Sequence, residues 1–351
     1  MKAYLKTYYF LLILILSISI NSCTSSKHIG EGQYLLSKTS IEENGFKVKN
    51  KALYSLLKQQ PNKRFLGIAP LKLALYNLAS PKKENSYLKK MGENPVILNY
   101  RLARKSVHQI ELYYKNKGYL DAKVTFNSSI KKHKAKAIYS ISSGHKYKIG
   151  AINIDLVDDG KFKELLNKLI EGSKIKTGYS YNFKDLEEER NRIALRIQNN
   201  GYYKFNKEYI HYLADTNQTK KIVDLNLIIK NVESNRSGTL LKEDHKIGVI
   251  GEINIFLSQL EPHLNDTTIR GGINFIYPNG TPPFNLNRLI EKVLLRSGLL
   301  YNKTFVDKTY QSLSELKNFK KISIEFSSLE STDKNDLLSA NIILLPGKKI
   351  A

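Results

Sequence analysis

The chain has 351 residues, 41% of them hydrophobic, which is enough for packed cores and suggests two or three domains. Its single cysteine excludes both an internal disulfide framework and a multi-cysteine metal site. The formal charge of +24 invites a nucleic-acid interpretation, but the lysines are spread along the chain and no nucleic-acid-binding signature accompanies them. Attraction to anionic lipid headgroups and a lysine-rich compositional bias are the explanations we retain.

A short apolar segment at the N-terminus leads directly to the cysteine. Residues 1–7 carry two lysines, residues 8–20 are almost entirely apolar, and Ser22 precedes Cys23. This pattern is typical of a secretory signal, and the run is short for a membrane-spanning helix. The segment resembles a bacterial lipobox, which implies cleavage between Ser22 and Cys23 and lipidation of Cys23. The alternative is a lone cysteine in an uncleaved signal anchor.

Two segments later in the chain align without gaps. Residues 166–171 match residues 286–291, and residues 178–182 match residues 298–302 at the same spacing. Each copy continues into a second stretch with helical apolar periodicity, and the glycine between the two stretches is a natural helix C-cap. An earlier helical stretch ends in a similar way, at residues 116–119. The chain therefore contains three copies of one unit, the first of them longer.

Period-two alternation predicts strands on both sides of the helix pairs. Before the helices, the alternating segments are residues 152–156 and 253–255. After the helices, the alternating segments are residues 124–126 with 135–141, 223–229 and 338–344. Each unit is thus predicted to run strand, helix, helix, strand, strand. Two helices on one face of a small sheet give a stable two-layer α+β fold.

This β-α-α-β-β order, in tandem behind an export signal, resembles the POTRA domains of the BamA/TamA outer-membrane assembly superfamily. Residues 64–78 and 91–98 are similar to segments of the TamA-like lipoproteins of Bacteroidota, the TamL family, and the resemblance covers essentially the whole chain. Residues 32–36, 266–268 and 272–277 also look familial. The resemblance implies a lipoprotein signal peptide (1–22), a lipidated tether (23–32) and three POTRA-like domains (33–145, 146–244 and 245–351).

One departure from the family concerns the C-terminus. The family carries a long C-terminal transmembrane β-barrel, whereas this sequence stops at residues 346–351, where the last POTRA strand would lead into the barrel. We expect a fragment of a longer protein, and the alternative is a relative without a barrel.

The resemblance implies that the chain binds polypeptides. Sheet edges present unpaired backbone groups, and an extended client segment can add to an edge as a further strand. By family analogy the edge is the first strand of each hairpin, at residues 121–126, 203–210 and 321–326. The expected partner-binding residues on these strands are Val124, Phe126, Tyr203, Phe205, Ile322 and Ile324.

We expect no enzyme activity, no cofactor and no metal site. The seven histidines are scattered, and Glu187–Glu189 is interpreted as a solvated helix start that suits the helix dipole. The expected partners are the membrane, through Cys23, and unfolded outer-membrane proteins or a TamB-like protein, with no nucleic acid and no small-molecule substrate. The expected location is a lipid anchor in the outer membrane with the domains in the periplasm. Two alternatives are a structural adaptor between the outer membrane and an inner-membrane partner, and an envelope lipoprotein hydrolase.

Overall fold

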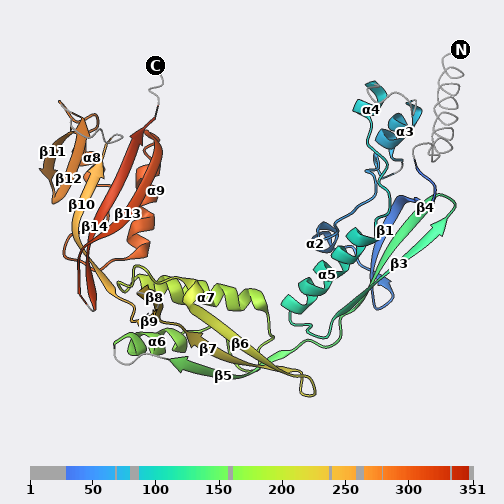
Figure 1. Ribbon diagram of the computed structural model, residues 1–351, viewed down its shortest axis with the longest axis horizontal. Coiled ribbons are helices and arrows are strands. Elements are labelled where there is room, and N and C mark those ends of the chain that lie inside the picture. The colour runs from blue at the N-terminus through green and yellow to red at the C-terminus, as the bar shows by residue number, and fades with distance from the viewer. Residues whose placement is uncertain are drawn as a thin grey trace, which may run out of the picture. The chain divides into compact units, whose positions relative to one another are not determined.

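The chain folds as two compact units that divide after Tyr147, shown in Figure 1. The computed structural model describes residues 29–67, 69–79, 87–156, 161–236, 239–257, 265–278, 280–332 and 334–347. The predicted signal peptide and Cys23 lie outside the described residues. Among the helices that are described, none is both long enough and apolar enough to cross a membrane.

The first unit contains a four-stranded sheet. Its strand order is β2 (Phe46–Lys47), β1 (Leu35–Glu43), β4 (Lys134–Ser142) and β3 (Lys123–Lys131). β1 runs parallel to β4, and β3 runs antiparallel to β4. The antiparallel pair is the hairpin that the alternation of residues 124–141 predicted, and its turn contains Lys132 at a φ of +55°.

Four helices connect β1 to the hairpin of the first unit. They are α2 (Lys51–Ser55), α3 (Leu71–Leu78), α4 (Tyr87–Met91) and α5 (Tyr100–Asn116). α5 places Ala103, Ile110 and Tyr114 in the core beside Tyr139 of β4, because these residues recur at helical spacing on one face. α3 and α4 are the insertion that makes this module longer than the other two.

The second module lies in the second unit and has a three-stranded sheet. The strand order is β5 (Lys148–Leu156), β7 (Ile222–Ile229) and β6 (Ile210–Asn217). Its helices are α6 (Lys161–Glu171) and α7 (Phe183–Gln198), and the 3-10 helix η1 (Lys207–Tyr209) precedes β6. Val223, Leu225, Leu227 and Ile229 of β7 are buried, as the alternation predicted. A two-stranded sheet, β8 (Val232–Arg236) and β9 (Thr239–Glu243), follows this module.

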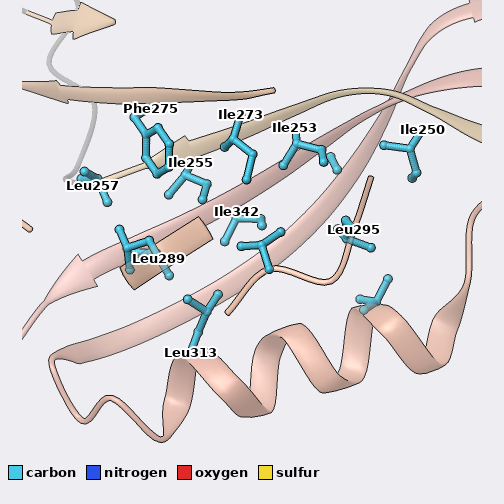
Figure 2. Close-up of a cluster of buried hydrophobic side chains, with 14 of the residues drawn as sticks. Ile250, Ile253, Ile255, Leu257, Ile273, Phe275, Leu289, Leu295, Leu313 and Ile342 are labelled. Atoms are coloured by element: carbon cyan, nitrogen blue, oxygen red, sulfur yellow. The ribbon is translucent and has the colours of Figure 1, made fainter. Parts of the chain in front are cut away.

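The third module has a five-stranded sheet. The strand order is β11 (Asn265–Arg270), β12 (Ile273–Pro278), β10 (Ile247–Phe256), β14 (Asn335–Pro346) and β13 (Phe319–Ser331). Its helices are α8 (Leu286–Ile290) and α9 (Lys303–Ser314). Figure 2 shows the core of this module, where Leu313 of α9 and Leu289 of α8 point toward Ile342 of β14. The predicted fold class, α+β with three tandem β-α-α-β-β modules, is confirmed.

The sequence repeat predicted similar helices for α6 and α8, but α8 is much shorter. The residues that correspond to the first turns of α6 are 281–285 in the third module, and they include Pro282 and Pro283. A proline disfavours helical backbone at the residue before it. The helix therefore begins only after Asn285, whose side chain accepts hydrogen bonds from the backbone N–H groups of Asn287 and Arg288.

Candidate functional site

The first strand of each hairpin is an outer strand of its sheet, as predicted. β3, β6 and β13 each pair with one neighbour, namely β4, β7 and β14. Among the described residues, no strand pairs with the other side of these three strands. Their outer backbone groups are therefore the kind that an added strand can bond.

The opposite side of each sheet is closed in part by a recurring loop contact. In the second module, Ile149 N–H donates to Tyr179 O at 2.7 Å and Gly178 N–H donates to Ile149 O at 2.8 Å. The loop before the second helix thus pairs with the start of the first strand. Gly178 has a φ of +84°, so its role is this turn, and the prediction that it caps α6 is wrong because α6 ends at Glu171.

The same contact recurs in the other two modules. In the third, Ile250 N–H donates to Leu299 O at 2.8 Å, and in the first, Leu36 N–H donates to Val96 O at 2.7 Å. The rest of β10 pairs with β12, and the end of β1 pairs with β2. In the second module, the later part of β5 is an outer strand among the strands that the structure describes.

β3 in the first module has a regular outer edge. Its nine residues pair with β4 without a bulge. Val124 N–H donates to Glu111 Oε1 on α5 at 3.0 Å, and Ile141, which lies opposite Val124, accepts from Asn44 N–H at 3.1 Å. Val124 and Ile141 therefore do not bond each other. The backbone N–H and C=O groups of successive residues point to opposite sides of a strand. Those of Phe126, Ser128 and Ile130 therefore face outward, like those of Val124.

The side chains of the predicted residues on β3 point to the core rather than to a partner. Val124 is buried, and Phe126 is half-buried against Tyr139, with ring centroids 5.3 Å apart. Tyr100 at the start of α5 packs edge-on against Phe126 at 6.0 Å and lies 3.3 Å from the hydroxyl of Ser128. Tyr100 thus joins α5 to β3. The outward-facing backbone groups of β3 lie beside this half-exposed tyrosine.

The prediction for the second hairpin is wrong in its location. Residues 203–209 precede the outer strand, which begins only at Ile210. Phe205 is buried in the core of the second module, where its ring lies 6.0 Å from that of Phe162. The edge was placed here by family analogy, but the segment turns after Gly201 and packs its aromatic rings inward. Tyr203 and Phe205 are therefore not residues of an edge.

The start of β6 is bonded to α7. Arg190 Nε donates to Ile210 O at 2.7 Å, and Arg190 also pairs with Glu187. In the third module, Ile322 and Ile324 do lie on the outer strand, where both are half-buried against the core. β13 carries two register shifts, near Lys320 and Leu329. Bulges disturb strand addition, so β13 is a weaker candidate for a binding edge than β3 or β6. β3 is the longer of these two bulge-free outer strands.

Tyr203 instead belongs to the junction between the second and third modules, which the sequence did not reveal. Its hydroxyl donates to Asp336 Oδ2 at 2.6 Å, and Ser331 donates to Asp336 Oδ1 at 2.6 Å. Asp336 is only 1% exposed and also pairs with Lys204 at 3.4 Å. Burial alone would raise the pKa of Asp336, but these hydrogen bonds and the nearby ammonium outweigh it and hold the pKa below its ordinary value.

Backbone groups and a side-chain amide complete this junction. Gly248 N–H donates to Gly201 O at 2.8 Å. A Cβ atom at Gly201 would lie 2.7 Å from Cγ2 of Ile247, so only glycine fits this approach. Asn199, at the end of α7, accepts a hydrogen bond from Thr304 N–H at the start of α9, at 2.9 Å. The junction thus links the two modules through a buried carboxylate, a close backbone contact and two helix ends.

The acidic run on α7 is solvated only in part, and it does not lie at the helix start, because α7 begins at Phe183. Glu188 is exposed, as expected, whereas Glu189 is buried and receives two hydrogen bonds from Arg192, at 2.7 and 2.8 Å. Arg192 also donates to Leu169 O on α6 at 2.6 Å, so the pair ties the two helices together. Within the described residues, no group of histidine, cysteine, aspartate and glutamate could hold a metal ion.

Comparisons with protein-family models and with curated proteins give no match. Comparison with solved structures finds POTRA domains 3–5 of BamA from Haemophilus influenzae, at 12% identity and a TM-score of 0.43, covering 90% of this chain and 99% of that one. It also finds POTRA domains 1–3 of Omp85 from Anabaena, at 11% identity and a TM-score of 0.30, covering 91% of this chain and 98% of that one. The N-terminal domain of Omp85 from Thermosynechococcus elongatus is similar at 11% identity and a TM-score of 0.27, covering 91% of this chain and 100% of that one.

Proposed function

We propose that this chain is the periplasmic POTRA region of an outer-membrane assembly lipoprotein of the TamL type. It binds extended polypeptides by strand addition, with β3 of the first module as the main edge. The observation that carries this proposal is the outer side of β3, whose backbone groups at Phe126, Ser128 and Ile130 face away from β4. The sequence resemblance to TamL and the repeated β-α-α-β-β order support the assignment to this family.

The binding chemistry is that of the backbone. An added strand gains main-chain hydrogen bonds that do not depend on its side chains. The partner-facing surface would therefore accept many client sequences, as a factor for unfolded outer-membrane proteins needs. A TamB-like protein with an exposed strand would bind through the same chemistry.

A proline at Ser128 tests the edge. Its backbone N–H faces outward, so a proline there leaves the pairing with β4 intact but removes one donor and crowds an added strand. One lost hydrogen bond corresponds to about 0.5–1.5 kcal/mol, and with the added crowding we expect about tenfold weaker binding. Photo-crosslinking of an unfolded outer-membrane protein to the full chain measures the change.

Ser128→Ala is the matched control. Like proline, alanine removes the hydroxyl that contacts Tyr100, but it keeps the backbone N–H. Amide hydrogen exchange in α5 and β4 checks that both variants keep the fold. Equal crosslinking of the two folded variants would show that clients bind elsewhere.

The lipid anchor is a separate part of the proposal. We place the acyl chains on Cys23, with the modules in the periplasm and the anchor in the outer membrane. Cys23→Ala removes the thiol that accepts the diacylglyceryl group, so the variant should take up no labelled palmitate and remain a longer precursor. Labelling of the variant equal to that of the unaltered chain would refute lipidation at this residue.

A further inference from the structure

The insertion between α2 and α5 of the first module exposes more apolar surface than its fold requires. Five large apolar side chains in it are more than half exposed, namely Phe65, Leu66, Leu78, Tyr87 and Met91. α4 buries none of its five residues. Soluble proteins rarely expose such a concentration of apolar groups unless the surface binds something.

Leu66 and Gly67 form a turn, and Leu66 is its exposed tip. Phe65 N–H, just before this turn, donates to Ala69 O at 2.8 Å. Leu66 has a φ of +48° and is 80% exposed. A non-glycine side chain is strained in this left-handed region, and burial does not offset the strain at Leu66. An exposed apolar residue kept in this conformation is a candidate contact residue.

Basic groups lie beside one of the exposed apolar side chains, Phe65. Lys63, Arg64 and Lys72 line a hollow of about 380 Å³ together with Phe65, Leu71 and a single carboxylate, that of Glu93. Lys90 of α4 adds a further exposed cation. Exposed apolar side chains close to cations are suited to binding a lipid bilayer, which has an anionic surface and an apolar interior.

The insertion is also held firmly enough to present these groups. A Cβ atom at Gly92 would lie 2.7 Å from the backbone of Tyr76, so α4 ends in close contact with α3. The buried Asn62 side chain donates to Asn94 O at 2.7 Å and accepts from Val96 N–H at 3.1 Å. These bonds join the two ends of the insertion, and Figure 1 shows α3 and α4 beyond the end of the sheet.

We propose that residues 63–67, together with α3 and α4, form a membrane-docking surface for anionic phospholipid, with Leu66 and Phe65 in the headgroup region and the basic hollow around a lipid phosphate. Amphipathic surfaces of this kind bind through buried apolar area and through the attraction of nearby basic residues to anionic lipids. The bilayer accounts for the exposed apolar tip and the cations together, whereas an acidic peptide would account only for the cations. This surface is independent of the β3 edge.

A fluorescent probe at Met91 tests the docking in the full-length chain. Cys23→Ser removes the only native cysteine, so Met91→Cys can carry an environment-sensitive dye. On vesicles that contain phosphatidylglycerol we expect a severalfold rise in emission and quenching by spin-labelled lipid, with little change on pure phosphatidylcholine. A dye at Leu213→Cys, an exposed residue of β6, is the matched probe and should not respond.

Two substitutions separate docking from folding. Leu66→Asn should abolish the response while thermal stability stays equal or rises, because asparagine tolerates positive φ. Lys63→Glu with Arg64→Glu should weaken the response severalfold, whereas Lys220→Glu in the β6–β7 turn should not. The proposal is overturned if the dye at Met91 stays silent on anionic vesicles, if it responds to poly-glutamate instead, or if Leu66→Asn responds like the unaltered chain.

Discussion

At the scale of single residues, the two buried carboxylates have partners that the sequence did not predict. Asp336 lies in an alternating strand pattern and Glu189 in an acidic run, and nothing in either pattern marks them as buried. Their partners, Tyr203 and Arg192, are placed by a turn and by a helix face. The periodicity of a sequence shows which face of a helix or strand a side chain occupies. The partner of a buried carboxylate depends instead on how the helices and strands pack against one another.

Asp336 should give the chain an acid-sensitive junction. Its pKa is lowered in the folded chain, so the carboxylate stabilises the fold above the ordinary aspartate pKa, and this contribution is lost as pH falls through the lowered value. At pH 7, Asp336→Asn should destabilise the third module by about 1–3 kcal/mol. The difference from the unaltered chain should shrink as pH falls below about 4. Urea unfolding followed by amide exchange in β10 and β14 measures it.

The matched control for this prediction is Asp307→Asn. Asp307 forms an ion pair with Lys303 on α9, and its side chain is 58% exposed, so its removal should change stability little at any pH. If both variants behave alike across the pH range, Asp336 does not hold the junction.

At the scale of elements, the order of helices and strands could be predicted, but several boundaries could not. The repeat located Asn182 and Asn302, which cap α7 and α9, and the alternation located β4, β7 and β14. The β11–β12 hairpin was missed because its alternation is short. The start of β6 was misplaced because an aromatic-rich turn precedes it.

The caps give a prediction at this scale. Asn99 occupies the corresponding position on α5, where its side chain accepts from Arg101 N–H at 2.9 Å and from Leu102 N–H at 3.2 Å. Asn99→Ala should destabilise the first module by about 1 kcal/mol. Asn99→Asp should keep the stability, since a carboxylate accepts the same bonds and suits a helix N-terminus. Thermal unfolding monitored by amide exchange in α5 distinguishes them, and equal loss in both would exclude a capping role.

At the scale of the whole molecule, tandem repetition was the strongest signal in the sequence. Two segments in register were enough to predict three modules, because helix pairs and alternating hairpins repeated around them. The exact domain boundaries remain a prediction. The candidate edge on β3 could be predicted by analogy with the family, in which the first strand of each hairpin is an outer strand. The junction through Asp336 could not be predicted, because it depends on how the second and third modules pack. The exposure of Leu66 could not be predicted either, because it depends on a backbone angle.

The glycine at position 201 makes the second and third modules mechanically dependent on each other. Its carbonyl bonds Gly248 at the start of β10, and a side chain there would collide with Ile247. Separating the two modules would therefore break this bond. It would also uncover Ile247, which packs against the core of the second module, and Tyr203, which packs against the core of the third.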